Sequence, residues 1–125
     1  MLDQKLLEVL QHPADGAIAI VTQGAGEPHV ANTWNSYANI TADDKLLFPA
    51  AGMNQTQQNI EKNNKVQLTV ANRQVQGKMY PGTGFLVKGT ARFITEGAEV
   101  DMMKTKFPWL RAVLEITVES AVQTL

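Results

Sequence analysis

The sequence contains no cysteine. This absence excludes disulfides, thiolate nucleophiles, iron–sulfur clusters and cysteine-ligated zinc. No apolar run approaches the roughly 18 residues that a membrane-spanning helix needs, so no membrane partner is expected. The first twelve residues, MLDQKLLEVLQH, also lack the basic start and the apolar block of a signal peptide. From these absences we expect a cytoplasmic protein.

Charges of one sign are not concentrated anywhere in the chain. There are 11 basic and 12 acidic residues, mixed along the sequence, and the formal net charge is −1. Without a Lys/Arg run, the electrostatic signature of nucleic-acid binding is missing. The two histidines, His12 and His29, have no acidic or histidine neighbours at metal-ligand spacing, so no metal site is expected. A Ser-His-Asp triad could use Ser36 or Ser120, but no nucleophile-elbow motif supports it.

What is present is typical of one globular domain over residues 1–125, with 44% hydrophobic and 18% charged residues. Residues 111–121 alternate, so that Leu114 and Ile116 point inward and Glu115 points outward. Together the patterns predict six or seven strands and about three short helices, without a βαβ rhythm. An antiparallel barrel with peripheral helices closes such a sheet. The expected strands are 16–23, 29–40, 45–50, 65–71, 85–93 and 111–121, and the expected helices are 3–11, 53–64 and 99–107.

The stretch NTWNSYANI, residues 32–40, is unusual for a strand because Trp34 and Tyr37 stand among asparagine, threonine and serine. Two flat π faces beside many hydrogen-bonding groups suit a strand that holds a flat, polar-edged ring cofactor. The same residues also suit an edge strand with ordinary core aromatics. The sequence leaves both readings open.

A second unusual stretch is PAAGMNQTQ, residues 49–57, where a strand end leads directly into a helix start. Free N–H groups there form an anion site, to which Asn54, Gln55 and Thr56 add side-chain donors. The alternative is a turn that caps itself, since Asn54 and Gln57 have capping-box spacing. An aromatic platform beside an anion site has the outline of a flavin mononucleotide (FMN) site.

Four blocks carry a resemblance to a known family: TQG…PHVANTWNSY, GMNQT…N, PGTGFLVKG and ITVESAVQTL. They resemble the small FMN-binding proteins of sulfate-reducing bacteria, which belong to the split-barrel superfamily of pyridoxamine-phosphate oxidases and flavin reductases. The likeness runs in order over essentially the whole chain. It implies a mainly β fold, a six-stranded antiparallel Greek-key split barrel with short peripheral helices. It also implies a homodimer with one FMN per subunit near the interface.

The resemblance implies roles for individual residues. Trp34, Tyr37 and Trp109 would surround the isoalloxazine ring, and the 32–37 backbone would meet its polar edge. Because strict alternation puts Trp34 and Tyr37 on opposite faces, a bulge or an approach from the strand edge is needed. Residues 49–56 would wrap the ribityl chain and phosphate, and Leu125 would come from the partner subunit. The implied FMN-binding residues are Asn32, Thr33, Trp34, Asn35, Ser36, Tyr37, Pro49, Ala50, Ala51, Gly52, Met53, Gln55, Thr56, Trp109 and Leu125.

Three positions differ from the family pattern. Asp15 stands where the relatives have a glutamate near the site, and Gln55 stands where they have a phosphate-loop lysine. Their double glycine is Ala51-Gly52 here, which restricts close backbone approach at residue 51. The missing lysine removes one positive charge opposite the phosphate.

The resemblance favours an FMN-binding electron carrier with an unidentified redox partner, because no acid–base pair for substrate chemistry is visible. The rival is an FMN-dependent oxidoreductase, either a flavin reductase or an enzyme like pyridoxamine-phosphate oxidase. A third possibility is a flavin-free dimerisation module.

Overall fold

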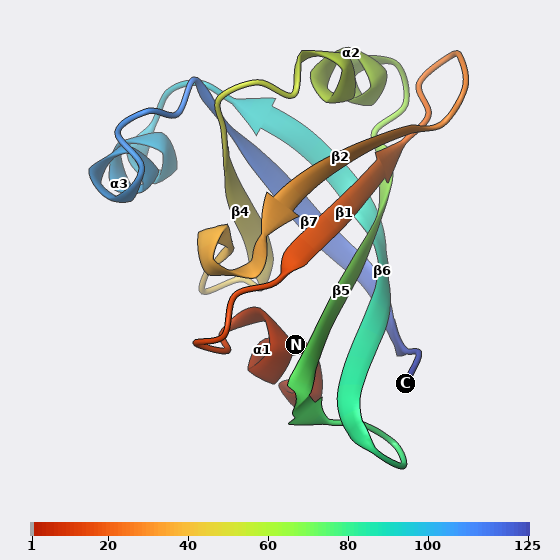
Figure 1. The fold of residues 1–125 in the computed structure, drawn as a ribbon. Coiled ribbons are helices and arrows are strands. Elements are labelled where there is room, and N and C mark those ends of the chain that lie inside the picture. The colour runs from red at the N-terminus through yellow and green to blue at the C-terminus, as the bar shows by residue number, and fades with distance from the viewer. Residues whose placement is uncertain (1) are drawn as a thin grey trace.

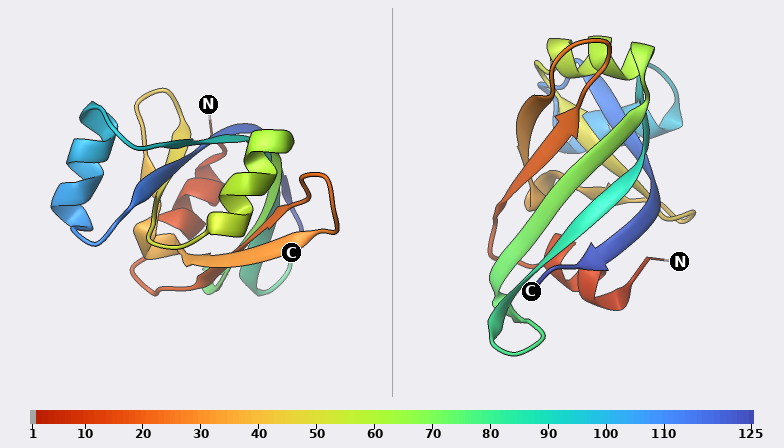
Figure 2. Two further views of the ribbon diagram at one scale, coloured as in Figure 1. Left: turned by 90° about the horizontal axis from the view of Figure 1, so that it is seen from above. Right: turned by 90° about the vertical axis from the view of Figure 1, so that its right-hand side faces the viewer.

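The computed structural model describes residues 2–125 and consists of one seven-stranded antiparallel sheet with short helices around it (Figure 1). The strand order is β2-β1-β5-β6-β7-β4-β3. The sheet curls into a barrel that stays open between its two edge strands, β2 and β3 (Figures 1 and 2). The elements are α1 (Gln4–Leu10), β1 (Ala17–Thr22), β2 (His29–Trp34), the 3-10 helix η1 (Asn35–Tyr37), β3 (Asn39–Ile40), β4 (Lys45–Ala50), α2 (Asn54–Lys62), β5 (Lys65–Gln76), β6 (Pro81–Ile94), α3 (Ala98–Lys106) and β7 (Ala112–Gln123).

The connections give the sheet its Greek-key character. Hairpins join β1 to β2 and β3 to β4, and β5, β6 and β7 form a meander. β4 and β5 follow one another in the chain but do not pair. β4 pairs with β7 and β5 pairs with β1, so the connection between them through α2 crosses from one part of the sheet to another. The predicted antiparallel split barrel is therefore confirmed.

The six-stranded barrel implied by the resemblance is corrected, because the sheet has seven strands, which is within the six or seven that the sequence patterns predict. The single strand expected over residues 29–40 is divided into β2 and the two-residue β3, with η1 between them. The break lies at Asn35, whose side chain is buried. Its Oδ1 accepts a hydrogen bond from the Gly16 N–H, and its Nδ2 donates to carbonyls at the end of α1, with the His12 oxygen at 3.2 Å. These bonds turn the chain inward at a point where an extended strand would continue.

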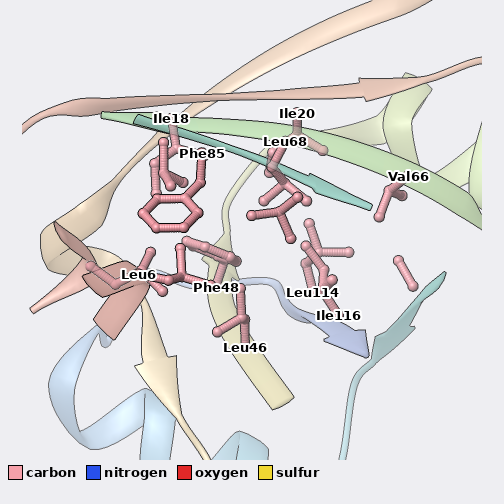
Figure 3. Packing of buried hydrophobic residues seen from close by; sticks show 14 of the residues in the cluster. Leu6, Ile18, Ile20, Leu46, Phe48, Val66, Leu68, Phe85, Leu114 and Ile116 are labelled. Atoms are coloured by element: carbon pink, nitrogen blue, oxygen red, sulfur yellow. The ribbon is translucent and has the colours of Figure 1, made fainter. Parts of the chain in front are cut away.

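The main core lies inside the curled sheet, where α1 closes one end (Figure 3). Asp3 caps α1 by accepting from the Lys5 and Leu6 N–H groups, and Leu6 is fully buried. Phe48 from β4 and Phe85 from β6 fill the interior beside it. Burial of side chains of this size contributes about 1.5–3 kcal/mol each.

A second, smaller apolar cluster attaches α3 to the barrel. Its buried members are Leu47 of β4, Val100 and Met103 of α3, Leu110, and Val113 of β7. α3 lies to one side of the barrel in Figure 1, beside β4. This packing fixes the segment that follows α3, which carries Trp109.

Glu115 of β7 points away from the core, as its place in the alternation predicts, but it is only 3% exposed. Its carboxylate accepts from Arg92 Nε at 2.8 Å and Nη2 at 3.3 Å, and Lys45 Nζ lies at 3.7 Å. These hydrogen bonds, together with the two positive charges, lower the pKa of Glu115. The three side chains tie β4, β6 and β7 together across the outer face of the sheet.

Over residues 2–125, none of the helices is both long and apolar enough to cross a membrane.

Candidate functional site

The turn between β2 and β3 is held by side chains from outside it. Asp15 accepts hydrogen bonds from the Ser36 N–H at 3.1 Å and the Ser36 hydroxyl at 2.9 Å. Asn35 is bound to the end of α1, as described above. The side chains of Asn35 and Ser36 therefore fix η1. The aromatic side chains of this segment are those of Trp34 and Tyr37.

Three aromatic side chains meet beside this turn. The Tyr37 ring centroid lies 5.2 Å from that of Phe107 and 5.5 Å from that of Trp109, and the Phe107 and Trp109 centroids are 5.7 Å apart. Trp109 is nevertheless 48% exposed, so much of its indole remains open to a ligand. Trp34 is 46% exposed and makes no ring contact of this kind within residues 2–125. The structure thus brings Tyr37 and Trp109 together and leaves Trp34 apart from them.

The remaining residues of the 32–37 segment lie at the end of β2. Asn32 is exposed and Thr33 is buried. β2 pairs with β1 on one side and forms one edge of the sheet. An edge strand leaves a row of backbone N–H and C=O groups without partners in the sheet. These groups could meet the polar edge of a ring.

The loop from β4 to α2 forms the second part of the site. Pro49 and Ala50 are buried at the end of β4, whereas Ala51 and Gly52 are exposed. A side chain built at Gly52 would meet nothing within 4 Å, so a ligand can approach the backbone there. Met53 follows in the left-handed conformation, with φ 62° and ψ 32°, and turns the chain into α2.

The start of α2 has no side-chain cap. The alternative of a self-capping turn with a capping box of Asn54 and Gln57 is wrong, because the N-cap residue is Met53 and no side chain caps the helix. The first N–H groups of a helix have no acceptor within it, so here they stay available to a ligand. Thr56 lies in this first turn with 0% exposure, and its Oγ1 has no hydrogen-bond partner. It is the one buried side-chain polar atom in this condition among residues 2–125.

An unpartnered buried hydroxyl costs about 1–3 kcal/mol. The open helix N–H groups of the same turn carry partial positive charge, and with them this hydroxyl would make a set of donors suited to an anion. Residues 54–56 are therefore a candidate anion site.

Gln55 lies at this helix start, but its side chain turns along the helix. Its Nε2 donates to Asn59 Oδ1 at 2.9 Å, and Asn59 Nδ2 donates to Thr22 Oγ1 of β1 at 3.1 Å. Gln55 thus links α2 to the sheet. It also lines a groove of about 740 Å³ between α2 and the β1–β2 turn, with His29 and Lys62.

Sequence reasoning missed Arg111, which holds the β4–α2 loop. Arg111 donates from Nη2 to the Gly52 carbonyl at 2.8 Å and from Nε to the Ala51 carbonyl at 3.3 Å. Its backbone N–H donates to the Ala50 carbonyl at 2.8 Å. Phe107 was also missed, although both residues stand in the same short segment as Trp109. That proximity to Trp109 was the signal that could have identified them.

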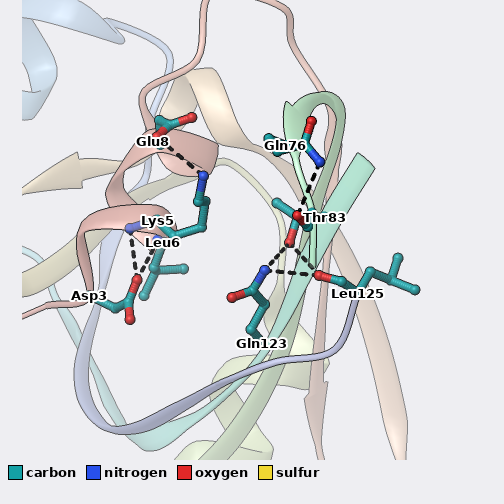
Figure 4. A network of polar contacts seen from close by, with 9 residues as sticks. Asp3, Lys5, Leu6, Glu8, Gln76, Thr83, Gln123 and Leu125 are labelled. Carbon is teal, nitrogen blue, oxygen red and sulfur yellow. Dashed lines mark hydrogen bonds and ion pairs between the residues drawn. The ribbon is translucent and has the colours of Figure 1, made fainter. Parts of the chain in front are cut away.

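Leu125 lies apart from these groups within one chain. Its carbonyl accepts from Thr83 Oγ1 and Gln123 Nε2, each at 2.9 Å, which fixes the chain end to β6 (Figure 4). Its side chain is 62% exposed and lines an apolar hollow of about 470 Å³ with Met79 and Tyr80. The C-terminus is distant from α3 in the views of Figures 1 and 2.

In the part of the chain that the structure describes, no three His, Cys, Asp or Glu side chains gather closely enough to hold a metal ion.

The chain is thus a split barrel that carries a partly exposed aromatic cluster and a helix start without a side-chain cap. The chain belongs to the pyridoxamine 5′-phosphate oxidase family, whose sequence profile matches residues 2–124. It is 43% identical, over 125 residues and the full length of both chains, to the FMN-binding protein of Nitratidesulfovibrio vulgaris strain Miyazaki F. The family expected from the sequence is confirmed.

Solved structures share the fold at lower identity. HupZ of Group A Streptococcus has a TM-score of 0.79 and 23% identity, and the match covers 98% of this chain and 94% of that one. An FMN-binding protein from Syntrophomonas wolfei has a TM-score of 0.77 and 15% identity, over 98% and 85% of the two chains. At these identities the likeness is one of fold.

Proposed function

We propose that this chain binds FMN, with the phosphate at the start of α2 and the ring against the aromatic cluster of Tyr37, Phe107 and Trp109. The observation that carries the proposal is the buried Thr56 hydroxyl, which lacks a partner beside uncapped helix N–H groups. A flat ring joined to a phosphate would use both parts of the site. The 43% identical relative, named as an FMN-binding protein, supports the choice of ligand.

The residues proposed to hold FMN are the set implied by the sequence resemblance. Trp34, Tyr37 and Trp109 would contact the ring, and the exposed Gly52 backbone would lie along the ribityl chain. Thr56 would donate its hydroxyl proton to a phosphate oxygen. The other members are Asn32, Thr33, Asn35, Ser36, Pro49, Ala50, Ala51, Met53, Gln55 and Leu125. For Asn35 and Ser36 the proposed contact is through the backbone, since their side chains hold η1.

The preference for FMN over riboflavin tests the phosphate site. A charge-assisted hydrogen bond contributes about 1.5–3 kcal/mol, which corresponds to a factor of about 10–100 in dissociation constant. Fluorescence-quenching titrations should therefore show FMN binding at least tenfold more tightly than riboflavin. Equal affinities would contradict a phosphate site at α2.

The proposed site includes a second subunit. Leu125 is exposed beside Met79 and Tyr80, and the C-terminus lies far from α3, which immediately precedes Phe107 and Trp109 (Figures 1 and 2). In a homodimer, the partner's C-terminal leucine would close the flavin site. Sedimentation analysis should give a dimer, and a monomer with full FMN affinity would contradict the shared site.

The proposed role is electron transfer between FMN and an unidentified partner protein. Bound FMN supplies one- and two-electron redox chemistry, while the chain binds the ring, orients it and limits its exposure to water. Asp15, whose carboxylate contacts the turn, is engaged by Ser36 and Gly16, which supports a carrier without acid–base chemistry of its own. The cytoplasmic setting expected from the sequence stays a prediction.

The family's name favours one alternative, an FMN-dependent oxidoreductase. Steady-state assays with NAD(P)H, and with pyridoxamine phosphate and oxygen, separate the two functions. A carrier should show negligible turnover without its partner protein, whereas sustained turnover of either substrate would identify an enzyme.

A further inference from the structure

We infer that Arg111 is the cationic residue of the anion site at α2, and that it binds the phosphate while it holds the loop beneath it. The inference rests on the proposed function, because it names the charged partner of the proposed FMN phosphate. It concerns a residue that immediately precedes β7 and is far in the sequence from α2.

The position of Arg111 follows from its bonds to the loop. Its Nη2 donates to the Gly52 carbonyl and its Nε to the Ala51 carbonyl. Gly52 immediately precedes Met53, the N-cap residue of α2. The guanidinium therefore lies at the start of the helix, on the side from which the chain enters. Arginine has five N–H donors in a planar arrangement, so donors remain after these two bonds.

The charge of Arg111 is available for a ligand. Arg111 is exposed, and none of the ion pairs within residues 2–125 involves it. α2 itself supplies no positive charge at this end, because its one basic residue, Lys62, lies in its last turn. Gln55 is neutral, and its amide is bound to Asn59. A phosphate at the open N–H groups would therefore find its positive partner in Arg111.

The same segment also fixes the aromatic part of the site. Trp109 precedes Arg111 by two residues, and the Arg111 N–H bond to the Ala50 carbonyl attaches the segment to the end of β4. One short stretch would thus set the ring and the phosphate of FMN at a fixed separation. A guanidinium is suited to this position because it binds phosphate bidentately, which an ammonium does not.

The test compares Arg111→Gln, Arg111→Lys and a matched control, Arg73→Gln, which removes an exposed arginine of β5. Dissociation constants for FMN and riboflavin are measured by fluorescence quenching at low and high salt, and the folding of each apoprotein by thermal denaturation. Arg111→Gln should weaken FMN binding by about 10–100-fold and riboflavin binding by less than about twofold. Arg111→Lys should lose less FMN affinity than Arg111→Gln and show a steeper salt dependence than Arg111→Gln, because it keeps the charge. Arg73→Gln should match the wild type.

Two results would overturn the inference while the proposed function stands. In the first, the wild type binds FMN more tightly than riboflavin, and Arg111→Gln keeps this preference. The other is an equal loss for both ligands, which would restrict Arg111 to holding the loop. If Arg111→Gln does not fold, the salt dependence of Arg111→Lys decides, and an FMN affinity that falls with salt no more than the riboflavin affinity does overturns the inference. A wild type without preference for FMN contradicts the proposed phosphate site itself.

Discussion

Replacing Thr56 by valine should have opposite effects on the apoprotein and on its affinity for FMN. Valine has nearly the same shape as threonine and a similar helix propensity, so the change removes little besides the hydroxyl. In the apoprotein that hydroxyl is fully buried and has no partner. In the FMN complex it would donate to the phosphate.

The magnitudes follow from these two environments. An unpartnered buried hydroxyl costs about 1–3 kcal/mol, so Thr56→Val should stabilise the apoprotein by about 1–2 kcal/mol. For a chain of this length the melting temperature should rise by about 4 °C per kcal/mol. Loss of a hydrogen bond to a charged phosphate costs about 1.5–3 kcal/mol, or a factor of about 10–100 in the dissociation constant for FMN.

The assay combines thermal denaturation of the apoprotein with fluorescence titrations of FMN and riboflavin. Thr56→Ser is the matched control, because it keeps the hydroxyl and should keep the preference for FMN. Riboflavin affinity should hardly change in either variant. A Thr56→Val apoprotein that is less stable than the wild type, yet binds FMN equally well, would show that Thr56 serves the core and not a ligand.

Three further predictions concern other parts of the molecule. Glu115→Gln should destabilise the protein by about 1 kcal/mol at pH 7 through loss of the charged bonds to Arg92. Since the pKa of Glu115 is lowered in the folded state, its contribution is present above the ordinary carboxyl pKa and is lost as the pH falls through the folded value. Chemical denaturation between pH 6 and 3 should therefore give a free energy of unfolding that changes less with pH for Glu115→Gln than for the wild type. The same pH dependence in both proteins would contradict this. Gln55→Lys should tighten FMN binding by about fivefold at low salt and lower apoprotein stability through loss of the bond to Asn59; equal gains for riboflavin would show that residue 55 does not face the phosphate. Leu125→Ala, which keeps the terminal carbonyl bonds, should weaken both dimerisation in sedimentation analysis and FMN affinity, and an unchanged dimer with unchanged affinity would argue against a shared site.

Most elements of the fold could be predicted because their causes are local. Residues 45–50 form β4 as expected, and the helix expected over residues 3–11 forms as α1, capped by Asp3. η1 could not be predicted, since it depends on bonds from Asn35 to Gly16 and to the end of α1. The burial of Glu115 depends in the same way on Arg92 and Lys45 from other strands. Alternation along a strand shows which face a side chain takes, but not what covers that face.

The candidate site was predictable in composition and not in arrangement. Trp34, Tyr37 and the loop at residue 52 attract notice from residue type alone. That Tyr37 meets Trp109, whereas Trp34 stands apart, depends on the break in the strand and on the packing of α3. The unpartnered Thr56 hydroxyl and the contact of Arg111 with Gly52 join segments distant in the sequence. No local pattern contains them.

The most direct test of the central proposal is titration of the purified apoprotein with FMN, followed by visible absorption and flavin fluorescence. An FMN ring stacked on Trp109 should have strongly quenched emission, and binding should saturate at one FMN per chain. Trp109→Ala should weaken binding and restore part of the emission, since an aromatic stack contributes about 0.5–1.5 kcal/mol beyond its buried area. Bright flavin emission at saturation, or no binding of FMN, would contradict the proposed site.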